Sequence, residues 1–377
     1  MTPFWVKIAS IIVVTCMFYF VLWRFFSFFH NYSKVIPLVI SIVLACVCIW
    51  AFFYQWENKI IDITSIFAWR LFVLSFLLFL ILIIEYVVSI RYKVNPWIIV
   101  WFIIVFFWVW AYFSLHTKIT YLNIETNKIH KDTKILLVSD IHAENVMQSF
   151  HINKIRKTIE AERPDFTIIA WDLINKANRS YAEYYKDIEP DYNPKYKPLI
   201  FAVIWNHDVM WNIEAIKKVV DVSNVVFLNN KTITYVDWAT IGDWCDADNS
   251  FETCTWAINI IWLVDKSLWW NNSLDQNLKN ANANKLNDNN FNILVTHQPI
   301  SLEKLKDYPV DLEVAWHTHR GQFYWMRKVV ELVNDYAYWE YKLWDRTAFV
   351  TQWIWTWWLP FRLWTQSEIV IINLKKK

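Results

Sequence analysis

The first third of the chain carries four long runs of apolar residues, and the rest alternates between short apolar runs and polar segments. Each long run approaches the roughly 20 residues that a helix needs to cross the hydrocarbon core of a bilayer. Tryptophans cluster near the ends of the runs, as aromatic residues do at membrane interfaces. The pattern predicts a four-helix transmembrane region over residues 1–117, followed by a second domain over residues 118–377. The runs are residues 4–23, 35–54, 69–90 and 96–115.

Beyond residue 118, apolar runs of strand length alternate with stretches of helical spacing, which predicts an α/β domain. Ile152, Ile155 and Ile159 recur at a helical interval and predict one buried helix face. Residues 270–290 are rich in Asn and have few apolar side chains, so they predict a loop or mobile surface rather than core. The main predicted strands are residues 135–139, 166–170, 199–204, 291–296 and 312–315.

Composition narrows the class of protein. Hydrophobic residues make up 56% of the chain, and the excess lies in the first third. The formal net charge of +2 gives no sign of a nucleic-acid partner.

Polar side chains that can bind metals follow the predicted strands. Ligands of open α/β sheets bind beyond the carboxyl ends of the strands, so this placement predicts a site there. His317 and His319 lie two residues apart, and their side chains point the same way if the backbone stays extended. The blocks, in order, contain Asp140 and His142, then Asp172, then Asn206, His207 and Asp208, then His297, then His317 and His319.

These five blocks resemble the calcineurin-like metallophosphoesterase superfamily. The pattern of that family is Asp-x-His, Gly-Asp, Gly-Asn-His-Asp/Glu, a lone His and Gly-His-x-His, and the resemblance runs from about residue 134 to residue 374. It looks closest to the membrane-linked branch of the superfamily. The resemblance implies a two-sheet α/β sandwich with helices outside, placed here after the transmembrane region.

The resemblance also implies a pair of divalent metal ions and assigns their ligands. Asp172 would bridge the two metals. Mixed oxygen and nitrogen ligands suit manganese, iron, zinc or cobalt and do not distinguish among them. His207 would act as a general acid toward the phosphoryl group or the leaving group, and Asp208 would orient it. One metal would be held by Asp140, His142, Asp172 and His319, and the other by Asp172, Asn206, His297 and His317.

The predicted function is that of a membrane-anchored phosphoesterase whose substrate is a phosphomonoester, a phosphodiester or a pyrophosphate. Relatives in the membrane-linked branch include enzymes that split the pyrophosphate of UDP-diacylglucosamine, so a lipid-linked substrate is one expectation. A nucleotide phosphodiesterase or nuclease of the same fold is an alternative, although the chain has no basic stripe. A catalytically inactive membrane scaffold that keeps the fold is another alternative.

The location that we expect is the cell membrane. Arg24 and Lys34, together with Arg91 and Lys93, give the short loops between apolar runs the denser positive charge, which predicts that these loops are cytoplasmic. The second domain would then face outward. A cytoplasmic substrate such as UDP-diacylglucosamine would require the opposite orientation.

The chain has 27 Trp and 2 Gly, which reverses the ordinary proportion of the two residues. Trp171, Trp205 and Trp316 stand where the resemblance requires Gly. Gly at such turns permits positive φ and a close approach of the backbone to a ligand, which Trp does not. Some bacteria read UGA as Gly, whereas other codon tables read it as Trp. We therefore expect most of the tryptophans to be UGA-encoded glycines in the cell.

Overall fold

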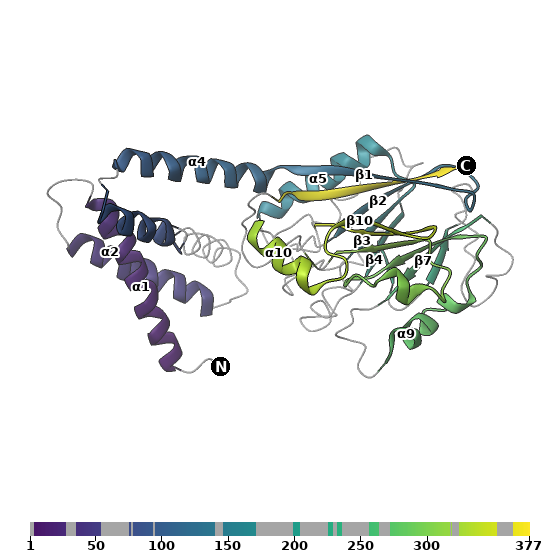
Figure 1. The fold of residues 1–377 in the computed structure, drawn as a ribbon, viewed down its shortest axis with the longest axis horizontal. Coiled ribbons are helices and arrows are strands. Elements are labelled where there is room, and N and C mark those ends of the chain that lie inside the picture. Colours follow the sequence, from purple (N-terminus) through teal and green to yellow (C-terminus); the bar gives the residue numbers. More distant parts are fainter. Residues whose placement is uncertain are drawn as a thin grey trace. The chain divides into compact units, whose positions relative to one another are not determined.

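The computed structural model describes most of the chain in separate stretches and divides it into two compact units, residues 1–111 and 112–377. The residues described are 4–27, 35–53, 75–76, 78–92, 95–139, 146–170, 199–203, 225–228, 232–235, 256–263, 272–316, 318, 324–352 and 365–377. Figure 1 shows the elements of both units.

Long helices make up the described part of the first unit. They are α1 (Phe4–Phe26), α2 (Val35–Phe53), a helical stretch over residues 78–89, and α4 (Pro96–Leu115), which continues into the second unit. The side chain of Asn95 accepts a hydrogen bond from the backbone N–H of Trp97 at 3.0 Å, and Pro96 follows it at the first helical position. This is the usual chemistry of a helix amino end, because proline lacks the N–H that would be unpaired there.

The first unit buries a few polar side chains beside its apolar clusters and exposes many other apolar side chains. The guanidinium of Arg24 donates to both carboxylate oxygens of Glu85, with Nε 2.6 Å from Oε2, and Glu85 and Ser41 are buried. The apolar side chains of Val13 and Ile84 are exposed.

Within the described ranges, no helix combines the length and apolar character needed to cross a membrane. The predicted four-helix transmembrane region is therefore not supported.

Two six-stranded sheets form the second unit, as the α/β prediction required (Figure 1). The first sheet has the order β1-β12-β2-β3-β4-β5, and the second has the order β10-β11-β9-β8-β7-β6. Strands β2 to β5 are parallel in the first sheet, and β7, β8, β9 and β11 are parallel in the second. The first sheet contains β1 (Thr117–Thr126), β2 (Thr133–Ser139), β3 (Phe166–Ala170), β4 (Leu199–Val203), β5 (Val225–Leu228) and β12 (Ser367–Lys376). The second contains β6 (Thr232–Tyr235), β7 (Ile258–Trp262), β8 (Phe291–Val295), β9 (Leu312–Ala315), β10 (Trp339–Leu343) and β11 (Arg346–Val350).

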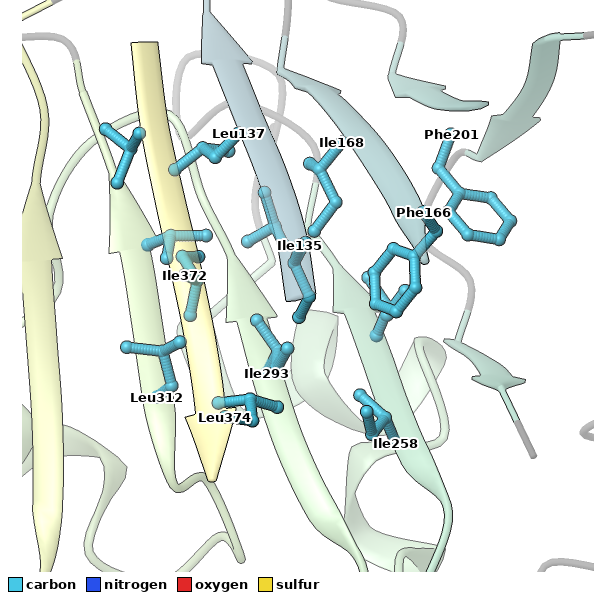
Figure 2. Close-up of a cluster of buried hydrophobic side chains, with 14 of the residues drawn as sticks. Ile135, Leu137, Phe166, Ile168, Phe201, Ile258, Ile293, Leu312, Ile372 and Leu374 are labelled. Carbon is cyan, nitrogen blue, oxygen red and sulfur yellow. The ribbon is translucent and has the colours of Figure 1, made fainter. Parts of the chain in front are cut away.

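The main apolar core lies between the two sheets. Alternate side chains of neighbouring strands point into it, such as Ile135 and Leu137 from β2, and these meet Ile293 of β8 and Leu312 of β9 (Figure 2). Period-two alternation puts every second residue of a strand on the same face. Burial of this apolar layer is therefore the main force that holds the two sheets together.

Helices cover the outer faces of the sheets. The buried residues of α5 (Val146–Glu162) include Ile152, Ile155 and Ile159, which confirms the predicted helix face. Glu162 at the end of α5 accepts hydrogen bonds from Tyr121 of β1 and Lys134 of β2, so α5 lies beside the first sheet. The remaining helices are α9 (Leu274–Asn280), α10 (Tyr324–Val333) and the 3-10 turns η4 (Ala283–Lys285) and η5 (Leu302–Leu305).

The prediction that residues 270–290 form loop or mobile surface was wrong. Helix α9 lies there, and Leu278 is fully buried in a second core cluster on the outer face of the second sheet. Ser273 caps the helix by accepting a hydrogen bond from the backbone N–H of Gln276. The amide of Asn277 is buried and donates to the Ser273 carbonyl oxygen at 2.9 Å. The Asn-rich composition hid the helix because here an asparagine satisfies a backbone group instead of breaking the helix.

Three tryptophans adopt a backbone conformation that favours glycine. The turn between β10 and β11 contains two residues, Trp344 and Asp345, because Leu343 pairs with Arg346. The favoured two-residue turns require positive φ at their first residue, which is usually Gly, Asn or Asp. Trp344 has φ of 57° and its side chain is 65% exposed, so no burial of the indole compensates for the backbone strain. The non-glycine residues with positive φ in the described ranges are Arg163, Trp256, Asn282, Trp339 and Trp344.

Candidate metal centre at the carboxyl edges of the two sheets

Three of the predicted site blocks follow neighbouring parallel strands of the first sheet. Asp140 comes directly after β2, Asp172 comes two residues after β3, and Asn206 comes three residues after β4. Ser139 at the end of β2 pairs with Ala170 at the end of β3, and β4 continues the same register. The three chain segments therefore leave the sheet at one edge.

The other two blocks follow neighbouring parallel strands of the second sheet. His297 comes two residues after β8, and His317 comes two residues after β9. Val295 of β8 pairs with Val314 of β9, so these two segments also leave their sheet at one edge.

Hydrogen bonds to Glu368 show that the two edges lie together. Strand β12 runs antiparallel to β2, with Val370 opposite Leu137, so Glu368 is level with Ser139 at the carboxyl end of β2. Its Oε2 atom accepts hydrogen bonds from Thr351 Oγ1 at 2.8 Å and from the backbone N–H of Gln352 at 3.1 Å. These residues directly follow β11, the parallel neighbour of β9. The strand ends that precede all five predicted blocks are therefore at the same end of the sandwich.

Of the predicted ligands and catalytic residues, the described ranges include His297. Its backbone carbonyl oxygen accepts a hydrogen bond from the N–H of Trp316 at 3.2 Å, which places it beside the residue that precedes His317. Its imidazole is 1% exposed and meets the Trp316 ring edge-on, with the ring centroids 5.8 Å apart. The predictions that lie outside the described residues are Asp140, His142, Asp172, Asn206, His207, Asp208, His317 and His319.

The donor set is suited to divalent metal ions, although its assembly is not visible in the described ranges. Among the described residues, no three His, Cys, Asp or Glu side chains lie close enough to hold a metal. The predicted set combines carboxylates, imidazoles and one amide, which are ligands that manganese, iron, zinc and cobalt accept. A nearly buried imidazole at a strand end, such as that of His297, fits a ligand of this kind.

Glu313 is a buried carboxyl group beside the candidate site that the sequence patterns did not identify. It lies in β9, and its Oε1 atom accepts hydrogen bonds from the backbone N–H of Ile300 at 2.6 Å and from Thr296 Oγ1 at 3.0 Å. It thus fixes the segment that contains His297. A single charged residue within an apolar strand was the signal that could have revealed it.

Burial raises the pKa of Glu313 from its ordinary value of 4.5 to about 8. The two hydrogen bonds that it accepts oppose this effect but are smaller. Within the described part of the chain, Oε2 has no hydrogen-bond partner, which agrees with a neutral carboxyl group in the folded protein at pH 7.

Comparisons with known proteins identify the same region of the chain. Residues 133–321, half of the chain, match the family model described as calcineurin-like phosphoesterase. An uncharacterized metallophosphoesterase of Campylobacter jejuni is 25% identical over 263 residues, which cover 68% of this chain and 63% of that protein. One of Helicobacter pylori strain J99 is 24% identical over 275 residues, which cover 72% of this chain and 68% of that protein.

Solved structures resemble the chain only distantly. A Plasmodium protein described as GAP50, the anchor in the inner membrane complex, superposes with a TM-score of 0.37 and 17% identity, over 58% of this chain and 71% of that one. The Haemophilus influenzae NAD nucleotidase gives a TM-score of 0.36 and 17% identity, over 59% of this chain and 45% of that one.

The pKa of Glu313 predicts a pH-dependent stability. Between pH 4.5 and about 8 the unfolded chain loses this proton while the folded chain keeps it, so rising pH favours unfolding across that window. The effect amounts to roughly 1.4 kcal/mol for each pKa unit of difference. Glu313→Gln stays neutral and keeps an acceptor oxygen for Ile300 and Thr296. We expect its melting temperature, relative to the wild-type chain, to rise steadily from pH 5 to pH 8.5.

Glu303 is exposed, so Glu303→Gln controls for the loss of one carboxylate from the same part of the chain. A difference between Glu313→Gln and the wild-type chain that stays constant across this pH range would contradict the prediction.

Proposed function

The chain belongs to the calcineurin-like phosphoesterase family, and from this membership we propose that it is a hydrolase of phosphoric esters that uses two divalent metal ions. The observation that supports the proposal most directly is the convergence of five motif-bearing strand ends at one end of the sandwich. A site of this kind needs ligands from several segments to meet, and parallel strands in register deliver them to one edge.

We propose the ligand set implied by the sequence resemblance, with Asp172 shared by both metals. When bound, two such cations would neutralise the anionic ester and act as Lewis acids. The backbone contact between His297 and Trp316 supports the assignment of His297 and His317 to a single metal. One metal would be held by Asp140, His142, Asp172 and His319, and the other by Asp172, Asn206, His297 and His317.

The proposed proton donor is His207. Its place directly after the ligand Asn206 allows the protonated imidazole to face the substrate instead of a metal. It would donate its proton to the oxygen of the leaving alcohol as the phosphorus–oxygen bond breaks, and water would supply the new oxygen of the phosphate. Asp208 would accept a hydrogen bond from the other ring nitrogen of His207 and orient the ring.

Two replacements separate ligand from proton donor. Asp172→Ala should abolish hydrolysis of an aryl phosphate and lower the manganese content, because it removes the bridging group. His207→Ala should keep its metal but lose about 10²–10⁴-fold in kcat, the usual contribution of a general acid. His130→Ala, an exposed histidine outside the blocks, should match the wild-type chain in both measurements. Full activity in Asp172→Ala would refute the ligand assignment, and metal loss in His207→Ala would make His207 a ligand.

We further propose that the first unit lies in a lipid membrane and that the substrate is lipid-linked. The support comes from the many exposed apolar side chains of this unit and from the paired charges of Arg24 and Glu85, of which Glu85 is buried. Charged groups in a membrane face the protein interior and pair with one another. We propose that the second unit faces outward, as the loop charges predict.

A charge placed on the outer surface of the first unit tests its surroundings. Ile104 is 61% exposed, so Ile104→Lys would be tolerated in water but would cost about 2.5–3.5 kcal/mol in hydrocarbon. Leu332→Lys is the matched control, because Leu332 is 85% exposed on α10 of the second unit. We expect only Ile104→Lys to lower the fraction of protein that stays with membranes after an alkaline carbonate wash. Equal retention of both variants would contradict the proposal.

We also propose that most tryptophans of the printed sequence are glycines in the cell, encoded by UGA. The family pattern requires Gly at Trp171, Trp205 and Trp316. The left-handed backbone at Trp344 and Trp339 supports the proposal independently, because these positions lie outside the site motifs.

The codons and the protein mass test the recoding directly. The gene should have UGA at Trp171, Trp205 and Trp316, and peptides from the native protein should be lighter by the difference between Trp and Gly.

Thermal stability provides a second test, because a left-handed φ disfavours any side chain with a Cβ atom by about 1–2 kcal/mol. Trp344→Gly should therefore melt at a higher temperature than Trp344→Ala, which keeps the Cβ atom. UGG codons at the three motif positions would refute the recoding.

A further inference from the structure

One buried carboxylate joins three segments of the second unit. Glu368, near the start of β12, is 1% exposed. Its Oε1 atom accepts hydrogen bonds from Thr120 Oγ1 of β1 at 2.6 Å and from Tyr338 Oη at 3.4 Å. Its Oε2 atom accepts from Thr351 Oγ1 at 2.8 Å and from the Gln352 N–H at 3.1 Å. We call these five residues the Glu368 cluster.

The Glu368 cluster lies at the end of the layer between the sheets, next to the candidate site. Val370 and Ile372 of β12 belong to the core between the sheets, so alternation directs Glu368 into the same layer. The carboxylate is level with Ser139, one residue before Asp140. The backbone N–H of Thr351 donates to the Ala315 carbonyl oxygen at 2.9 Å, two residues before His317.

The cluster is not what apolar packing alone would select. A buried carboxylate is costly unless hydrogen bonds compensate for its lost hydration. Within the described ranges, no Lys, Arg or His forms an ion pair with Glu368. Even a buried ion pair is often no more stabilising than apolar residues of similar volume, and Glu368 has no charged partner among the described residues to offset its lost hydration. A carboxylate held by neutral donors at this place therefore points to a role in the site.

We propose that Glu368 is a positioning residue of the candidate metal centre, fixing the spacing between the Asp140 segment of the first sheet and the His317 segment of the second. The inference rests on the proposed function, in which one metal takes ligands from both sheets. Such ligands must be held to within about 0.5 Å of the working geometry. A hydrogen-bonded carboxylate fixes the two edges more sharply than apolar contacts, which have no direction.

Glu368 is not itself a candidate ligand. Each of its oxygens accepts two hydrogen bonds, so the four acceptor positions of the carboxylate are occupied. Its effect on a metal would pass through the segments that it holds. Removal of such outer groups typically lowers metal affinity 10–100-fold.

A matched pair of replacements tests this role. Thr351→Val removes one donor to Glu368 and keeps the shape of the side chain. Thr234→Val makes the same change in β6 of the same sheet, where the hydroxyl of Thr234 donates to Asn259 Oδ1 at 2.7 Å. Both threonines are 2% exposed. Asn259 and its partner Asn292 lie near the amino ends of β7 and β8, away from the candidate site.

Manganese binding is measured by calorimetry on the full-length chain in detergent, and the interaction between the two ions by electron paramagnetic resonance. We expect both variants to melt at similarly lowered temperatures. Only Thr351→Val should weaken manganese binding, by about 10-fold or more, and change the manganese–manganese coupling. Glu368→Gln should recover much of the affinity lost in Glu368→Ala, because its amide oxygen can still accept from Thr351 and Gln352.

The outcomes separate this inference from the proposed function. If the wild-type chain binds none of manganese, iron, zinc and cobalt, both the inference and the proposed function are wrong. If it binds two ions and Thr351→Val binds them as tightly, the inference about Glu368 is wrong and the phosphoesterase proposal stands. Equal weakening in Thr234→Val and Thr351→Val would make the effect one of general stability and would also overturn it.

Discussion

The parallel register of neighbouring strands is the constraint on which the candidate site depends. Ser139 pairs with Ala170 in one sheet, and Val295 pairs with Val314 in the other, so each sheet ends in a level edge. Segments that are far apart in the sequence leave the sandwich side by side. A hydrolytic site built from scattered carboxylates and imidazoles needs this arrangement, because no single segment supplies enough ligands.

The sandwich changes from apolar to polar toward that edge. Most of the layer between the sheets is packed by side chains such as Ile135 and Ile293, whereas Glu368 lies where the layer meets the ligand-bearing segments. Glu313 has a related place on the outer face of the second sheet, where it holds the segment of His297. Neither buried carboxyl group belongs to the predicted ligand set. Each accepts hydrogen bonds from chain segments next to the candidate site, Glu368 in the layer between the sheets and Glu313 on the outer face of the second sheet.

Both units have apolar cores, but the first exposes many more apolar side chains than the second. The second unit buries its apolar side chains in two core clusters between and behind its sheets. The first unit exposes apolar side chains such as Val13 and Ile104 and encloses the pair of Arg24 and Glu85. Trp344 is unusual in the second unit, because its indole is exposed and its backbone conformation is one that glycine favours. This bears on which residue occupies position 344 in the cell and leaves the fold unchanged.

The spacing of apolar residues was enough to predict the helices and strands that have a regular period. The buried face of α5 and the strands before the site blocks follow from spacing alone, because helix and strand place side chains at fixed intervals. The residue pattern did not predict α9. Burial of Leu278 and the cap at Ser273 favour a helix there in spite of the Asn-rich composition. Helix α9 has seven residues, and only Leu274 and Leu278 contribute to its apolar face, so it is too short for helical periodicity to reveal it.

The sequence by itself determined the family, most of the strands and the order of the candidate ligands. Only the tertiary structure decided that β12 enters between β1 and β2, and that the carboxyl edges of both sheets lie together. It also decided the partners of buried polar groups, such as Thr120 and Glu368, which are 248 residues apart. Periodicity acts over a few neighbouring residues, whereas a buried carboxylate is satisfied by whichever donors the whole fold brings to it.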